Sequence, residues 1–338
     1  KEWRFGRPQR ILYSFEIMIQ ILELFGGIGA PRKALINLGI PHKSIDYVEW
    51  NEKAVRSYNA MFEKEIKYQP QSVVGWNLKP DILVHGSPCQ DFSIGGKQYG
   101  GNVEDGTRSS LMFETLKIIE NFGIWKPRVV IWENVPNVFS KKLVGAFQKY
   151  LSDMEKLGYF TTYKILNAMD FGIPQKRKRV FAISKLDGEP FNFDLLKHRP
   201  LKPLGNFLEV TTDQKYLVTQ PSMLSKIRSK NSLANGFSGR LEVVNDFVYT
   251  ITTRQDRCPN SGLIEYEKNK YRILTEKECW RLMGFDDDDF NNAKKANPGK
   301  NEKYKNTTLY HQAGNSIVVP VLEAIFECLL PESDKRCN

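Results

Sequence analysis

One cysteine stands at a position where a chemical step could take place. Cys89 lies in the segment Gly86-Ser87-Pro88-Cys89-Gln90-Asp91-Phe92-Ser93, directly after the short apolar run 81–85. A lone cysteine is usually a small buried apolar residue, but its thiolate is also a strong nucleophile. The following loop is rich in glycine, at Gly95, Gly96, Gly100, Gly101 and Gly106. This composition is typical of a mobile lid, so the position favours a nucleophilic Cys89.

Two further polar segments flank apolar runs. Glu133 follows the run 128–132, and a carboxyl there can donate a proton if burial raises its pKa; an exposed capping acid is the alternative. In Gln175-Lys176-Arg177-Lys178-Arg179, strand alternation places Gln175, Arg177 and Arg179 on one face. Their amide and guanidinium donors suit an anionic or carbonyl-bearing target, and a solvated basic patch is the alternative.

A glycine turn, Phe25-Gly26-Gly27-Ile28-Gly29, follows the first apolar run. Glycines there let the backbone approach a ligand at the carboxyl end of a sheet. Glu49 stands about 20 residues further on, where an acid accepts hydrogen bonds from ribose hydroxyls. The pair predicts an adenosine-containing cofactor, although the spacing is not GxGxxG. Trp50 either stacks on adenine or fills the core, and core filling is the commoner role.

The elements that must position these residues alternate between strand and helix. We expect strands at 18–24, 44–48, 81–85, 128–132, 161–166 and 180–184, and helices at 31–38, 52–59, 109–122 and 143–157. Such alternation predicts an α/β fold with a doubly wound, mostly parallel sheet and helices on both faces.

The alternation stops near residue 185, which predicts a smaller, mainly irregular or β domain with short strands at 242–244 and 247–252. The helix pattern returns at Thr275, which forms a capping box with Glu278, and Gly284 ends that helix. Residues 286–306 are predicted to form a solvated loop. The expected division is an extension at 1–17 that is foreign or poorly ordered, a catalytic and cofactor-binding domain at 18–184, the smaller domain at 185–285, and a return to the first domain at 286–338 with the last helix at 317–330.

Composition narrows the function classes. The chain has 338 residues, of which 41% are hydrophobic, too many for a disordered protein. No run reaches the roughly 18 apolar residues of a membrane span. Five cysteines without a CxxC pair and four scattered histidines predict neither a disulfide framework nor a metal site, and a reducing cytoplasm is expected. The net charge of +10 attracts polyanions, or serves solubility alone.

In this order, the motifs resemble the DNA (cytosine-5) methyltransferase family of bacterial or phage type. The resemblance runs from Ile21 to about Leu330, and only residues 185–270 lack a family signature. It rests on Phe25–Gly29, Pro88-Cys89-Gln90, Glu133-Asn134-Val135, Gln175-x-Arg177-x-Arg179, Arg272-x-Leu274-Thr275 through Arg281-Leu282-Met283-Gly284-Phe285, and Gly314-Asn315-Ser316-Ile317.

The resemblance implies methyl transfer from S-adenosylmethionine to C5 of a cytosine, leaving S-adenosylhomocysteine. The cytosine is flipped out of a specific double-stranded DNA sequence and bound covalently through C6 to Cys89. Glu133 would hold or protonate N3, while Arg179, with Arg177, would bind the cytosine O2 and a nearby phosphate. The smaller domain would recognise the target sequence.

The resemblance and the motifs also give two sets of binding residues. The expected cofactor-binding residues are Phe25, Gly27, Ile28, Gly29, Glu49, Trp50, Pro88, Leu111, Asn315 and Ser316. The expected DNA-binding residues are Gln90, Ser93, Asn134, Gln175, Arg240, Thr253, Arg254 and Arg257. For each arginine of the smaller domain, a phosphate contact or a free surface charge is the alternative to base recognition.

Two other functions stay open at this stage. A tRNA-directed cytosine methyltransferase shares the DNA-type motifs, although the large RNA-directed group has a second cysteine in place of Glu133-Asn134-Val135. A catalytically inactive DNA-binding regulator is the other. The expected partner is double-stranded DNA, with a cognate restriction endonuclease acting in the same system without a stable complex. The protein is expected to be a cytoplasmic monomer in a bacterial host.

Overall fold

A six-stranded mixed sheet forms the centre of the larger lobe, with strand order β2-β1-β3-β4-β7-β5. The computed structural model describes residues 18–62, 67–70, 72–73, 80–86, 111–141, 143–186, 188–228 and 241–330. The strands are β1 (Ile19–Leu24), β2 (His42–Val48), β3 (Ile82–His85), β4 (Val129–Asn134), β5 (Phe160–Asn167) and β7 (Lys178–Lys185). The pairs β1–β2, β1–β3 and β3–β4 are parallel, whereas β7 is antiparallel to β4 and β5. No α-helix crosses over between β5 and β7, so these strands pair antiparallel.

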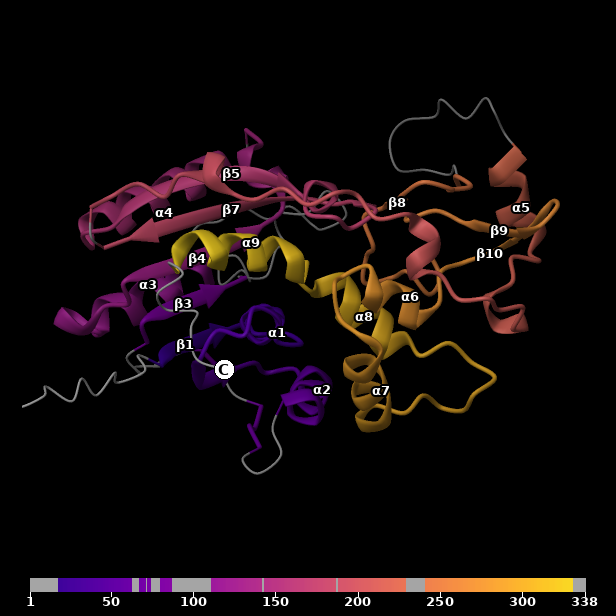
Figure 1. The fold of residues 1–338 in the computed structure, drawn as a ribbon, viewed down its shortest axis with the longest axis horizontal. Helices are drawn as coiled ribbons and strands as arrows, with labels where there is room; N and C mark the ends of the chain where they lie inside the picture. Colours follow the sequence, from indigo (N-terminus) through magenta and orange to yellow (C-terminus); the bar gives the residue numbers. More distant parts are fainter. Residues whose placement is uncertain are drawn as a thin grey trace, which may run out of the picture.

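Helices cover both faces of this sheet (Figure 1). They are α1 (Ala30–Asn37), α2 (Glu52–Phe62), α3 (Leu111–Asn121), α4 (Val144–Lys156) and α9 (Val319–Leu329). Strand side chains alternate between two cores: Ile131 joins a cluster with residues of α1 and α9, and its neighbour Trp132 joins one with residues of α3 and α4. The predicted α/β fold with helices on both faces is confirmed.

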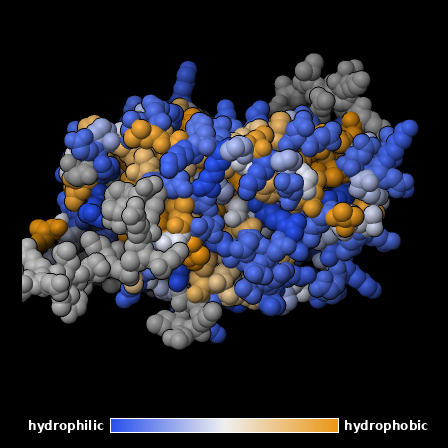
Figure 2. Space-filling view, in the orientation of Figure 1, coloured by the Kyte–Doolittle hydropathy of each residue, from blue (hydrophilic) through white to orange (hydrophobic). Residues whose placement is uncertain are grey.

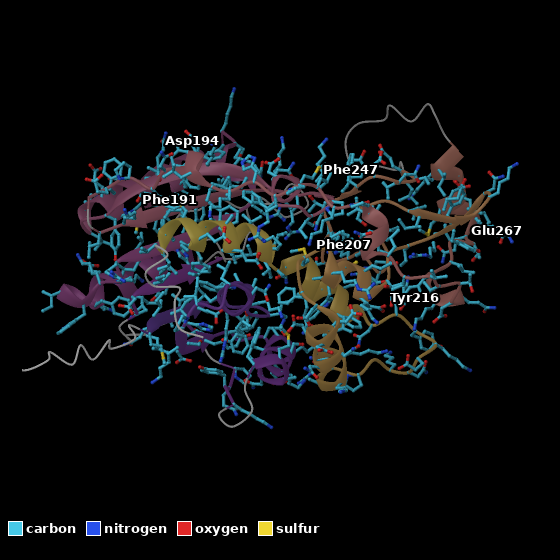
Figure 3. The ribbon with its side chains drawn as sticks, in the orientation of Figure 1. Phe191, Asp194, Phe207, Tyr216, Phe247 and Glu267 are labelled. Carbon is cyan, nitrogen blue, oxygen red and sulfur yellow. The ribbon has the colours of Figure 1, made fainter. Side chains whose placement is uncertain are left out.

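The smaller lobe is built from short strands and turns beside the larger one (Figure 1). It contains α5 (Pro221–Arg228), β8 (Val248–Tyr249), and the antiparallel pair β9 (Ile264–Glu267) and β10 (Lys270–Arg272). β8 pairs in parallel with β6 (Gln175–Lys176) of the larger lobe. Figure 3 shows Phe207 near the middle of the molecule, Tyr216 within the smaller lobe and Glu267 toward the distal end of that lobe.

Residues just beyond the expected boundary at 184 still pack on the main sheet. Thr162 Oγ1 of β5 donates to the carbonyl of Phe191, 2.9 Å away. Lys164 forms an ion pair of 2.7 Å with Asp194. Figure 3 shows Phe191 and Asp194 beside β5 and β7. The main chain therefore leaves the larger lobe only after this segment.

The C-terminal part is more helical than expected. It contains α6 (Glu276–Arg281), α7 (Asp287–Ala296) and α8 (Thr307–Asn315), so the prediction of a solvated loop over 286–306 is wrong for its first half. Asp286 and Asp289 form a reciprocal capping box, in which each carboxylate accepts from the other residue's backbone N–H. This box starts α7. The visible face over α7 and the following loop is strongly hydrophilic (Figure 2).

Membrane-spanning helices and metal-binding clusters are both absent from the residues that the structure describes. Within the residues that the structure describes, no helix has the length and apolar character needed to cross a bilayer. Across the same ranges, no cluster of histidine, cysteine, aspartate or glutamate could hold a metal ion.

Candidate active site

The candidate site lies at the carboxyl ends of β3 and β4. These parallel strands are in register, with His85 opposite Trp132. A Cβ built on Gly86 would lie 3.7 Å from Glu133 Oε2, so the chain that leads to Cys89 starts beside Glu133. Five predicted site residues lie outside the described residues: Pro88, Cys89, Gln90, Ser93 and Arg240.

Glu133 forms an ion pair with Arg179. The distance from Arg179 Nε to Glu133 Oε1 is 3.2 Å, and both side chains are largely buried. The antiparallel pairing of β4 with β7 brings them together, because Glu133 lies opposite Phe181. Burial raises the pKa of the Glu133 carboxyl, while the charges of Arg179 and Arg177 oppose that rise. The arrangement suits a carboxyl that holds a proton beside a fixed cation.

Arg177 connects three parts of the chain. It is only 3% exposed. Its Nη1 donates to the carbonyl of Ile251 at 2.8 Å, and its Nη2 donates to those of Gly314 and Ser316 at 3.0 and 2.8 Å. The carbonyl groups that Arg177 binds in this structure therefore belong to the protein's own backbone. Contact between Arg177 and cytosine stays a prediction.

The side chains of Gln175 and Asn134 also form hydrogen bonds within the protein. Gln175 Oε1 accepts from the N–H of Ile251 at 3.1 Å, and its Nε2 donates to the carbonyl of Leu282 at 2.8 Å. Asn134 Oδ1 accepts from the N–H of Val135 at 2.9 Å. Both side chains are buried. This burial disfavours direct contacts with DNA, which remain untested predictions.

The turn 252–258 carries two of the predicted DNA-binding arginines at the surface. Arg254 and Arg257 are exposed, and Thr253 is half-buried. A Cβ on Gly314 would lie 2.4 Å from the backbone of Thr252 and Thr253, so only glycine lets α8 approach this turn so closely. Gln255 is buried and donates to Ser261 Oγ at 2.5 Å. The two arginines therefore project from a turn whose base is fixed.

The glycine turn is held by the end of β2. Gly27 has a φ of +54°, a left-handed conformation that favours glycine. Glu49 Oε2 accepts from the N–H of Gly27 at 3.1 Å, and Glu49 Oε1 accepts from the N–H of Asn51 at 3.0 Å. Burial raises the pKa of Glu49, and these backbone donors oppose the rise. Each carboxylate oxygen has further lone pairs, so Glu49 can accept additional hydrogen bonds.

The other residues predicted to bind the cofactor differ in their solvent exposure. Trp50 is 72% exposed, so core filling, the role favoured for it alone, is wrong. Ile28 is 2% exposed and belongs to the core that contains α1 and α9, where its side chain does not reach the surface. Phe25 is half-buried, with a φ of +54°. The side chain of Leu111, the first residue of α3, lies outside the description.

The last motif lies where α8 ends. Asn315 is exposed, and its Nδ2 lies 3.3 Å from Nδ1 of His311. Ser316 is buried and donates through Oγ to the carbonyl of Ile317 at 3.0 Å. Because Arg177 binds the carbonyls of Gly314 and Ser316, this motif is joined to the strand that carries Arg179.

Tyr47 was not among the predicted site residues. Its hydroxyl donates to the carbonyl of Gly27 at 2.5 Å. The signal in the sequence was its position two residues before Glu49, which places both on one face of a strand. An aromatic residue within a strand usually belongs to the core, so its type alone does not indicate a role in a binding site.

The family model for C-5 cytosine-specific DNA methylases matches residues 19–330. The chain belongs to this family. The methylase is 31% identical to the type II methyltransferase M2.ScrFI of Lactococcus lactis subsp. cremoris, over 92% of this chain and 98% of that protein. It is 29% identical to the type II methyltransferase M.HhaI of Haemophilus parahaemolyticus, over 91% of this chain and 93% of that one.

Solved structures agree on the fold. The crystal structure of the Dnmt2 methyltransferase of S. pombe matches with a TM-score of 0.71 at 21% identity, over 93% of this chain and 99% of that one. A putative DNA modification methyltransferase encoded in an E. coli prophage matches with a TM-score of 0.65 at 18% identity. The predicted family and the enzyme class, a DNA cytosine-5 methyltransferase, are confirmed, and an inactive regulator is not favoured.

Proposed function

We propose that this methylase acts on a cytosine flipped out of a specific double-stranded DNA sequence, with Cys89 as the nucleophile and S-adenosylmethionine as the methyl donor. The observation that carries the proposal is the buried Glu133–Arg179 pair, 3.2 Å apart, next to the start of the Cys89 loop. Cytosine is a poor nucleophile at C5, and a thiolate that adds at C6 overcomes this.

The roles of the side chains follow from this chemistry. The Cys89 thiolate forms a bond to C6, and the C5–C6 π electrons move toward C5 and N3. Glu133, whose raised pKa favours the protonated form, gives its proton or a hydrogen bond to N3. Arg179 stays charged and offers donors to the cytosine O2. After methylation at C5, a base such as a water molecule takes the C5 proton, the C5–C6 double bond re-forms, and the C6–S bond breaks to release the Cys89 thiolate.

The glycine turn fits S-adenosylmethionine. The Gly27 backbone is exposed to approach because a Cβ there would meet nothing within 4 Å. Glu49 offers carboxylate oxygens for a ribose, and the exposed ring of Trp50 offers a face for adenine. Asn315 completes the proposed pocket. When bound, S-adenosylmethionine supplies an electrophilic methyl group.

The exposed arginines at the turn 252–258 are proposed to contact DNA. Arg254 and Arg257 project from this turn, and the net charge of +10 favours a polyanion. If either arginine reads a guanine edge, its loss costs about 1–3 kcal/mol of discrimination at one base pair. We further propose a cytoplasmic monomer that acts beside, and not in complex with, a cognate restriction endonuclease.

The proposal is tested with labelled S-adenosylmethionine and two substrates, mixed-sequence duplex DNA and tRNA. We expect label in DNA at C5 of cytosine within one short sequence, read by bisulfite conversion and sequencing. Label in tRNA alone would assign the enzyme to RNA and contradict the proposal. The RNA alternative is carried by the shared motifs, and the structural likeness to Dnmt2 at 21% identity adds only the fold.

A further inference from the structure

The N–H and the carbonyl of Gly27 both form hydrogen bonds to side chains at the end of β2. Its N–H donates to Glu49 Oε2 at 3.1 Å, and its carbonyl accepts from the hydroxyl of Tyr47 at 2.5 Å. Tyr47 lies near the end of β2, and Glu49 follows its last residue, Val48. The end of β2 and the residue after it therefore fix both peptide groups of Gly27.

The ring of Tyr47 also supports the turn. A Cβ on Gly26 would lie 2.6 Å from ring carbons Cδ2 and Cε2 of Tyr47. The Tyr47 ring is stacked on Tyr58 with centroids 3.7 Å apart, and Tyr47 is fully buried. A Cβ on Gly29 would in turn lie 2.6 Å from the rings of Tyr58 and Phe62. The glycine turn thus rests on an aromatic platform made of Tyr47, Tyr58 and Phe62.

The hydrogen bond from the Tyr47 hydroxyl also sets the direction of the N–H of Ile28. The peptide group between Gly27 and Ile28 is planar and trans, so its C=O and N–H point in opposite directions. Because the Gly27 carbonyl points toward Tyr47, the N–H of Ile28 points away from the platform. A rotation of this peptide would turn that donor inward and break the bond to Tyr47.

We propose that Tyr47 is a positioning residue for the cofactor: its hydroxyl fixes the orientation of the Gly27–Ile28 peptide, and its ring sets the height of the turn against which S-adenosylmethionine binds. The inference rests on the proposed cofactor site. Tyr47 acts through the backbone of Gly27 and does not itself touch the cofactor.

The environment of Tyr47 keeps its hydroxyl in the donating form. Burial raises the pKa of Tyr47 well above its ordinary value, and the neighbouring carboxyls of Glu49 and Glu23 add to that rise. The hydroxyl therefore stays protonated throughout the pH range in which the enzyme can be assayed. A carbonyl acceptor on Gly27 matches this donor at any such pH.

The test compares Tyr47→Phe with Tyr159→Phe. Tyr159 is a matched control, because its buried hydroxyl also donates to a backbone carbonyl, that of Pro127 at 2.7 Å, near the start of β4 and away from the glycine turn. Each variant loses one buried hydroxyl and keeps its ring. Binding of S-adenosylhomocysteine to the whole protein is measured by calorimetry, and KM and kcat are measured with duplex DNA.

We expect Tyr47→Phe to weaken S-adenosylhomocysteine binding by roughly 3- to 10-fold. The KM for S-adenosylmethionine should rise by a similar factor, with little change in kcat or in DNA affinity. Tyr159→Phe should leave all these values within about twofold while losing similar thermal stability. Equal cofactor binding by wild type and Tyr47→Phe would overturn the inference, as would equal losses in both variants.

A second pair of variants tests the ring. Gly26→Ala places a methyl group against Tyr47 and should weaken cofactor binding more than Tyr47→Phe does. Gly145→Ala in α4, where a Cβ meets nothing within 4 Å, should not change it. Unchanged binding by Gly26→Ala would contradict the platform. Failure of the wild-type protein to bind S-adenosylhomocysteine would instead contradict the proposed function.

Discussion

Two opposing effects set the protonation state of the Glu133 side chain. Burial disfavours the charged carboxylate, and Arg179 favours it. Because burial is the larger effect, the carboxyl is ready to share a proton with the ring nitrogen of a bound cytosine. Arg179 remains a cation in either state.

Replacing Glu133 with Gln should lower kcat by roughly 10²- to 10⁴-fold, because Gln cannot transfer a proton. Binding of DNA and S-adenosylhomocysteine should change little. Asp153→Asn is the control, since Asp153 forms only surface ion pairs with Lys149 and Lys156. Single-turnover methylation would measure the step. A Glu133→Gln enzyme with near-normal kcat would show that Glu133 serves only to hold Arg179.

Glu23 is a second buried acid, and it lies next to Gly26 of the glycine turn. Its Oε1 accepts from the hydroxyl of Tyr58 at 2.7 Å, and burial raises its pKa from 4.5 to about 7. The folded protein thus binds this proton more tightly than the unfolded chain. The stabilising contribution is complete below the unfolded pKa and is lost as the pH rises toward 7.

Glu23→Gln should therefore gain stability relative to wild type as the pH rises from about 5 to about 7.5, by at most about 3 kcal/mol. Gln keeps an acceptor for Tyr58 but does not titrate. Urea unfolding at several pH values gives the difference in unfolding free energy. A difference that does not vary with pH would contradict the prediction.

The pH dependence that His85 gives to stability is opposite to that of Glu23, so the effect of Glu23 is measured as the difference between wild type and Glu23→Gln. It is buried at the end of β3 beside the hydroxyl of Tyr150, and burial lowers its pKa to about 3. Its neutral form is favoured in the folded state, so its contribution is lost as the pH falls below the unfolded pKa of 6.5. In the wild-type protein, His85 and Glu23 therefore oppose one another between about pH 4.5 and 6.5.

At the scale of elements, hydrophobic patterning predicted the strands and helices of the main sheet to within a few residues. It missed α7, because four consecutive aspartates and a Lys/Asn-rich run suggest a loop. The Asp286–Asp289 capping box was the signal that α7 begins there. The antiparallel direction of β7 was not predicted, although the lack of a helical segment between β5 and β7 was a signal for it in the sequence.

The local sequence pattern did not predict the long-range hydrogen bonds of the site. The sequence placed hydrogen-bond donors at Gln175, Arg177 and Arg179. The backbone groups that Gln175 and Arg177 bind lie 74 to 139 residues away in the chain. Nothing local says that Arg177 binds the carbonyls of Ile251, Gly314 and Ser316. The roles proposed for Cys89 and Glu133 rest on the motifs that resemble those of the family.

Arg177→Lys tests whether this connection fixes the turn 252–258. An ammonium can replace only part of a guanidinium's bonds to three carbonyls, so the unfolding free energy should fall by roughly 2–3 kcal/mol. Hydrogen exchange within 251–258 should rise, and discrimination between the target and single-base variants should relax. Arg128→Lys, at an exposed residue before β4, is the control. Unchanged exchange and discrimination would contradict this role.

At the scale of the whole molecule, segments far apart in sequence close the fold. Lys33 of α1 binds Asp286 at 2.6 Å and Asp289 at 2.7 Å, and both Lys33 and Asp289 are largely buried. The bonds join the first helix to the start of α7. On the other side, Asn37 donates to Glu323 of α9 at 2.7 Å. These contacts join the C-terminal helices to α1 of the larger lobe.

Lys33→Met should lower the unfolding free energy by roughly 3 kcal/mol, because it leaves the buried Asp289 carboxylate without its cation. The double variant Lys33→Met/Asp289→Asn should recover part of that loss, since the uncompensated charge is gone. Urea unfolding of the three proteins measures the effect. A double variant less stable than Lys33→Met would show that the capping role of Asp289 outweighs its charge.

The central claim is that Cys89 forms a covalent bond to the target cytosine, and it is tested most directly with duplex DNA that carries 5-fluorocytosine at the methylated position. Fluorine at C5 cannot leave as a proton, so the final step should stop with DNA attached to the protein. We predict a DNA adduct that survives denaturation, requires S-adenosylmethionine, and is absent in Cys89→Ser. No adduct with a protein that methylates ordinary DNA, or an adduct that persists in Cys89→Ser, would contradict the account.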